Sequence, residues 1–138
     1  MECRQNDKVG VMSTAYGSFG EFITSKREGK DITLREMARI LEVSAPYLSD
    51  VEKDRRNPFD IDRLERLAGV LELDAGERDL MLDLAGKGRK TVAPDLPEYI
   101  MEREYVSAAL RTARDLNAGE KEWMQFIEEL IRRKGQEG

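Results

Sequence analysis

Histidine is absent from this sequence, and cysteine occurs once, at Cys3. The Ser/His/Asp and Cys/His arrangements of nucleophilic catalysis require a histidine as base, and an ordinary zinc site is built from histidines or several cysteines. A lone cysteine also cannot form an internal disulfide, which agrees with a reducing compartment. We therefore expect a protein that is not an enzyme and that carries no metal or other cofactor.

Long apolar runs and aromatic residues are scarce as well. No apolar stretch approaches the roughly 20 residues that a membrane-spanning helix needs, and the amino terminus lacks the basic segment and apolar core of a secretory signal. Charged residues make up 37% of the chain and aromatic residues 7%, which is typical of amphipathic helices in water. We expect a cytoplasmic protein that makes no membrane contact, with one core and a smaller appendage.

The charge balance is acidic, with a net charge of −5. Taken alone, this value argues against nucleic-acid binding, because neutralising phosphates requires local positive charge. Residues 1–58, however, hold ten basic and ten acidic residues, so the excess negative charge lies in the rest of the chain. The amino-terminal half therefore remains compatible with a DNA-binding face.

Apolar residues recur at helical spacing along most of the chain, which predicts an all-α fold. We expect a disordered arm over 1–15, a domain of five helices over 16–85, a linker over 86–97 and a helical region over 98–138. The last helix of the domain is predicted to end at Ala85, because glycine, proline and basic residues follow it.

The second and third helices of the domain have clear start signals. Thr33 and Glu36 have the spacing of a capping box, and Ser44 is placed to cap the next helix after a three-residue turn. Asn57-Pro58 ends the basic loop that follows this third helix. Two helices joined by a short turn, with small and polar residues opening the second, are typical of the helix-turn-helix that inserts its second helix into the DNA major groove.

The residues of this region resemble those of the Cro/cI-type (XRE) helix-turn-helix repressors over roughly residues 17–85. The resemblance rests on Thr33-Leu34-Arg35-Glu36-Met37-Ala38, Val43-Ser44, Leu48-Ser49, Val51-Glu52 and Asn57-Pro58. It implies a five-helix, lambda-repressor-like domain that binds a palindromic DNA operator as a homodimer and represses transcription. The DNA-binding residues that it implies are Thr33, Leu34, Ser44, Ala45, Pro46, Tyr47, Ser49, Asp50, Lys53, Arg55 and Arg56.

These residues divide by expected role. Side chains of the third helix would read base edges, while the amide end of the second helix and the basic loop would hold phosphates. For Arg55 and Arg56 the alternative is a solvated loop charge, and Tyr47 is equally compatible with packing. The third helix lacks the Gln, Asn and Arg side chains that make the strongest base contacts. Glu42 also stands where the family usually has glycine, so a left-handed backbone there would cost about 1 kcal/mol.

The carboxy-terminal region is too short to bury its apolar faces alone. A stripe at helical spacing on its last helix is therefore expected to form a dimer interface, with a simple core as the alternative. The stripe consists of Trp123, Phe126, Ile127, Leu130 and Ile131.

A narrower resemblance concerns Ser44 to Glu52, Arg56-Asn57-Pro58, Leu96-Pro97 and the helical tail. Together they look like the repressors that are paired with ImmA/IrrE-type metallopeptidases. The resemblance implies that such a peptidase inactivates the protein by cleavage, for which Val106–Arg114 is the expected segment. Two other functions stay open: an antitoxin that represses its own promoter, and a protein-interaction module that does not bind DNA.

Overall fold

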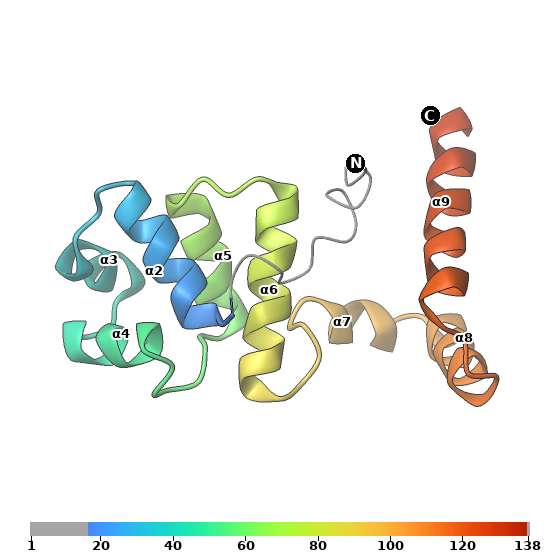
Figure 1. The fold of residues 1–138 in the computed structure, drawn as a ribbon, viewed down its shortest axis with the longest axis horizontal. Helices are drawn as coiled ribbons and strands as arrows, with labels where there is room; N and C mark the ends of the chain where they lie inside the picture. The colour runs from blue at the N-terminus through green and yellow to red at the C-terminus, as the bar shows by residue number, and fades with distance from the viewer. Residues whose placement is uncertain (1–16, 138) are drawn as a thin grey trace. The chain divides into compact units, whose positions relative to one another are not determined.

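The computed structural model describes residues 17–137, and the expected arm over 1–15 lies outside them. The described residues form eight α-helices and no strand (Figure 1). The chain divides into two compact units, with the boundary between Pro97 and Glu98. The predicted all-α fold, with a helix-turn-helix domain followed by a helical tail, is confirmed.

The first unit contains five helices, each opened by a side chain that caps its first turn. The side chains of Ser18, Thr33, Ser44, Asp60 and Asp74 each accept a hydrogen bond from the backbone amide three residues further on. Such caps satisfy amides that have no partner inside the helix. The five helices are α2 (Phe19–Gly29), α3 (Leu34–Leu41), α4 (Ala45–Glu52), α5 (Ile61–Val70) and α6 (Ala75–Arg89).

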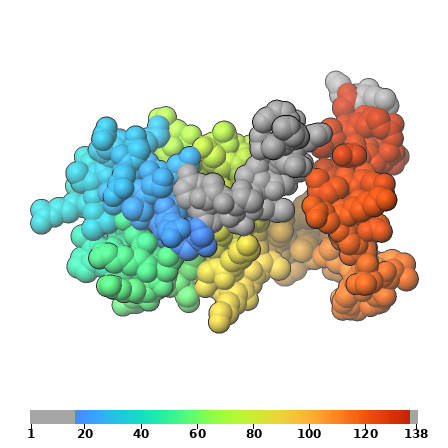
Figure 2. Space-filling model, in the orientation of Figure 1, coloured from blue at the N-terminus to red at the C-terminus, as the bar shows by residue number. Residues whose placement is uncertain are grey.

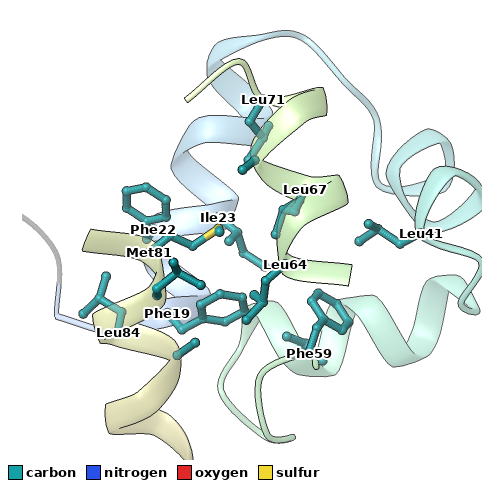
Figure 3. Packing of buried hydrophobic residues seen from close by; sticks show 14 of the residues in the cluster. Phe19, Phe22, Ile23, Leu41, Phe59, Leu64, Leu67, Leu71, Met81 and Leu84 are labelled. Atoms are coloured by element: carbon teal, nitrogen blue, oxygen red, sulfur yellow. The ribbon is translucent and has the colours of Figure 1, made fainter. Parts of the chain in front are cut away.

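One apolar core holds these helices together (Figure 3). Each helix contributes side chains at the spacing of a single face, and the residues buried in this cluster are apolar. Because one face of each helix is held in this core, the opposite face of each helix is directed towards solvent. The labelled core residues of Figure 3 are Phe19, Phe22, Ile23, Leu41, Phe59, Leu64, Leu67, Leu71, Met81 and Leu84.

The segment predicted as a linker, 86–97, differs from the expectation. α6 continues for four residues past Ala85, ending at Arg89, and Ala93 is buried against the core. The chain after α6 folds back and packs against Gly86. Only glycine leaves room for this contact, because a Cβ atom there would lie 2.8 Å from the backbone of Val92 and Ala93. Gly86, predicted from the sequence to lie in a linker, is instead a position where the backbone packs closely.

The boundary between the units falls inside α7 (Leu96–Met101). The second unit contains the rest of this helix, α8 (Glu104–Asp115) and α9 (Glu120–Glu137). None of the side chains described between 98 and 135 is buried. Large apolar side chains of this unit are therefore exposed, namely Tyr99, Met101, Tyr105, Leu110, Leu116, Trp123, Phe126, Leu130 and Ile131. No helix of the described residues is both long and apolar enough to cross a bilayer.

Candidate nucleic-acid interface

α3 begins with the capping box that the sequence predicts. The amide of Glu36 donates to Thr33 Oγ1 over 3.1 Å, and the amide of Thr33 donates to Glu36 Oε1 over 3.0 Å. The hydrogen bonds also hold the pKa of Glu36 below its ordinary value. Because two amides of this helix end are used in the cap, the amides of Leu34 and Arg35 are the ones left to face an anion.

The turn between α3 and α4 is left-handed at Glu42, with φ 61° and ψ 45°. The Glu42 side chain is exposed, and its carboxylate lies 4.0 Å from Arg66. An exposed ion pair at this distance adds little stability. The turn therefore adopts the left-handed conformation that favours glycine, the residue that the resemblance implies here. Because Glu42 carries a side chain, this conformation costs more free energy than it would with glycine.

Glu42→Gly is expected to stabilise the protein by about 0.5 to 1 kcal/mol, because glycine adopts this conformation without strain but adds freedom to the unfolded chain. Urea unfolding followed by circular dichroism measures the change. The same substitution at Glu28, an exposed position inside α2, should instead destabilise by about 1 kcal/mol. A lower stability for Glu42→Gly would contradict the assignment of strain to this turn.

α4 has one buried face and one open face. Leu48 and Val51 are buried in the core and anchor the helix. Ala45 and Tyr47 also pack partly against the core. Ser44, Pro46 and Lys53 are exposed, and Ala45, Tyr47, Ser49 and Asp50 are half-buried.

The loop after α4 places two exposed arginines beside this open face. Arg55 Nη1 lies 3.7 Å from Asp50 Oδ1. The guanidinium of Arg56 lies over the ring of Tyr47, 5.2 Å from its centroid, and this ring contacts Phe59 at 6.1 Å between centroids. Tyr47 therefore packs on the core edge and also supports Arg56; a contact of Tyr47 with phosphate stays a prediction.

Contacts that the sequence did not reveal fix the position of α4. Arg27 of α2 donates to both carboxylate oxygens of Glu52, over 2.8 and 3.0 Å, and also to the carbonyl of Ile32, over 2.9 Å. The side chains of Arg27 and Glu52 are only 12% and 7% exposed. The hydrogen bond with Glu52 raises the pKa of Arg27 above its ordinary value. This bidentate pair joins the end of α2 to the end of the helix that carries the candidate site.

A second tie joins the start of α2 to the same loop. Asp54 accepts hydrogen bonds from Ser18 Oγ, over 2.6 Å, and from the amide of Gly20, over 3.1 Å. Position 20 requires glycine, because a Cβ atom there would collide with the backbone of Glu52. A glycine inside a helical apolar pattern was the available signal for this close approach.

The arrangement defines the first unit as a helix-turn-helix fold, in which α4 is the second helix. Residues 18–81 match the family described as the helix-turn-helix domain. Among the described residues, no group of three or more acidic, histidine or cysteine side chains is placed to hold a metal ion.

Curated relatives and a solved structure are similar to parts of the chain. Two HTH-type transcriptional regulators of Mycobacterium tuberculosis, from strains CDC 1551 / Oshkosh and ATCC 25618 / H37Rv, are each 41% identical to it over 56 residues. These residues make up 41% of this chain and 39% of each relative, so the match spans well under half of the relatives. A chain from the complex of the SinR and SinI proteins aligns over 85% of this chain and 98% of its own length, at 21% identity and a TM-score of 0.42.

Proposed function

We propose that the chain is a sequence-specific DNA-binding transcriptional regulator that represses from a palindromic operator as a homodimer. The observation that carries this proposal is the open outer face of α4, which is anchored by Leu48 and Val51 and flanked by the exposed Arg55 and Arg56. A helix held in this way can present its open face to a major groove, while the arginines neutralise phosphates beside it. The similarity of residues 18–81 to helix-turn-helix domains supports this proposal.

Base reading would come from side chains of α4. The carboxylate of Asp50 can accept a hydrogen bond from the amino group of cytosine, and Ala45 and Pro46 offer apolar contact to the methyl group of thymine. Ser49 and Ser44 can exchange hydrogen bonds with either a base or a phosphate. Phosphates would be held near Thr33 and Leu34 at the start of α3, where the cap leaves the amides of Leu34 and Arg35 without a partner inside the helix, and by Lys53, Arg55 and Arg56.

Selection of bound duplexes from a random pool tests this function. The parent protein is expected to enrich a palindrome, and Asp50→Asn is expected to shift one position of each half-site from cytosine towards adenine, because an amide pairs with adenine. Asp62→Asn makes the same charge change at an exposed position of α5 and should leave the selected sequence unchanged. No enrichment by the parent would contradict the proposed function, and an unchanged preference in Asp50→Asn would contradict the role of this residue.

The homodimer is proposed to form through the α9 stripe, defined as Trp123, Phe126, Ile127, Leu130 and Ile131. Four of these side chains are exposed, with Phe126 at 56% and Ile131 at 59%. Such a continuous apolar strip is costly to leave in water, and a second copy of the same helix offers a complementary strip. A dimer would present two copies of α4 to major grooves about 34 Å apart.

Light scattering on the full chain tests the dimer. The parent is expected to have the mass of a dimer, and Phe126→Glu is expected to weaken association by at least about tenfold, because the carboxylate would be buried at the interface. Leu116→Glu introduces the same charge at a side chain that is 78% exposed and lies outside the stripe, and it should remain dimeric. A monomeric parent would contradict this part of the proposal.

The resemblance to the peptidase-paired repressors supplies a mechanism of release. We propose that an ImmA/IrrE-type metallopeptidase cleaves within Val106–Arg114, so that the α9 stripe is separated from the DNA-binding unit. α8, which contains this segment, buries none of its residues. Cleavage elsewhere, or no cleavage when the two purified proteins are mixed, would contradict the proposal.

Two other results would favour the alternative functions. A toxin bound to the α9 stripe would favour the antitoxin, and absence of DNA binding would favour an interaction module.

A further inference from the structure

The carboxy-terminal end of α6 lies directly against the loop that follows α4. Arg89 Nη2 donates to the carbonyl of Pro58 over 2.7 Å. A Cβ atom at Gly88 would lie 2.8 Å from Pro58 Cγ, so the helix approaches the loop as closely as a glycine permits. Figures 1 and 2 show this end of α6, in yellow, on the same side of the first unit as the green loop.

Both elements border one small depression. Its volume is about 150 Å³, and it is lined by Asp54, Arg55, Arg56, Asn57, Pro58 and Gly88. The last turn of α6 contributes to this site although its Arg89 lies 31 residues further along the chain than Pro58. The last turn of α6 therefore borders the loop that carries Arg55 and Arg56.

The last turn of α6, which borders this depression through Gly88, is rich in basic residues. The run from Gly86 to Thr91 contains Lys87, Arg89 and Lys90 and no acidic residue. The charge of Lys87 acts on Asp83, whose pKa is nevertheless raised by burial and by the carboxylates of Asp79 and Asp95. Lys90 is exposed, and its backbone ends α6 in the left-handed conformation with φ 62°. Within the part of the chain that the structure describes, no carboxylate forms an ion pair with Lys90.

We propose that Lys87 and Lys90 bind backbone phosphates of duplex DNA, which extends the binding surface from the α4 loop onto the end of α6. Arg89 acts as a positioning residue, because its hydrogen bond to Pro58 fixes the lysines relative to Arg55 and Arg56. This inference rests on the proposed function. A simpler role is that lysines in the last turn only complement the helix dipole, and this role would leave DNA binding unaffected.

The test compares the parent with a double variant, Lys87→Gln with Lys90→Gln, in full-length protein. Binding to a mixed-sequence duplex of about three helical turns is followed by fluorescence anisotropy between about 50 and 200 mM salt. Each lost phosphate contact should lower the slope of log K against log salt by about 0.9, hence by about 1.8 per subunit. The loss should be the same on any sequence, because phosphate contacts carry no sequence information.

A matched control removes two lysines elsewhere. Lys30→Gln with Lys121→Gln gives the same net charge, and Lys30, like Lys87, lies beside a carboxylate, since it pairs with Glu72 over 2.7 Å. This control should keep the slope of the parent. If the Lys87/Lys90 variant is folded and also keeps the parent's slope, the extension onto α6 is overturned while the proposed function stands. If the parent shows no salt-dependent binding to any duplex, the proposed function itself fails.

Discussion

Replacing Arg27 with methionine is expected to lower the free energy of unfolding by about 3 kcal/mol, because the substitution leaves the carboxylate of Glu52 buried without a counter-charge. The Glu52 side chain is 7% exposed, and its carboxylate receives two hydrogen bonds from Arg27. A loss of this size is a large part of the 5 to 15 kcal/mol that typically stabilises a small domain. Urea unfolding followed by circular dichroism measures the change.

A second substitution in the same background separates the charge from the packing. Arg27→Met combined with Glu52→Met should recover most of the lost stability, because a buried ion pair can often be replaced by apolar side chains at little cost. Arg78→Met is the matched control, since Arg78 forms a similar pair with Glu65 but both side chains are 35% or more exposed. Its cost should be below about 1 kcal/mol. Equal losses for Arg27→Met and Arg78→Met would show that burial of the first pair does not matter.

The local parts of the fold could be predicted because their signals lie within a few residues of each other. Thr33 and Glu36 form a reciprocal cap across one helical turn, and Ser44 caps the next helix in the same way. The apolar spacing of Leu48 and Val51 likewise showed which face of α4 is buried. Such features depend on helix geometry alone, so the order of the helices and the open face of α4 followed from the sequence.

The parts that were missed depend on contacts between distant residues. Arg27 and Glu52 are twenty-five residues apart, and nothing in the spacing of charges distinguishes this buried pair from the many solvated ones. The packing of Gly88 against Pro58 was missed for a related reason. Glycines and basic residues are typical of linkers, yet here the glycines permit close helix packing and the basic residues extend a surface.

Arg55→Ala combined with Arg56→Ala is expected to weaken DNA binding more than any other change at the surface of the first unit. Each arginine that leaves a phosphate lowers the salt slope by about 0.9, so a dimer that loses two contacts per subunit should show a slope lower by about 3.6. At physiological salt this corresponds to a loss of affinity of about a hundredfold or more. The measurement is the dissociation constant of the selected operator and of a mixed-sequence duplex as salt is varied.

The loss should be similar on both duplexes, because these arginines are placed beside α4 rather than on its base-reading face. Stability should change little, since the Arg55–Asp50 pair is exposed and Arg56 only stacks on Tyr47. Arg111→Ala with Arg114→Ala removes the same charge from exposed positions of α8, where Arg114 also pairs with a neighbouring carboxylate. This control should bind like the parent. A double variant of Arg55 and Arg56 that retains the parent's slope would place the phosphate contacts of this domain elsewhere, and a loss confined to the operator would mean that the arginines read bases.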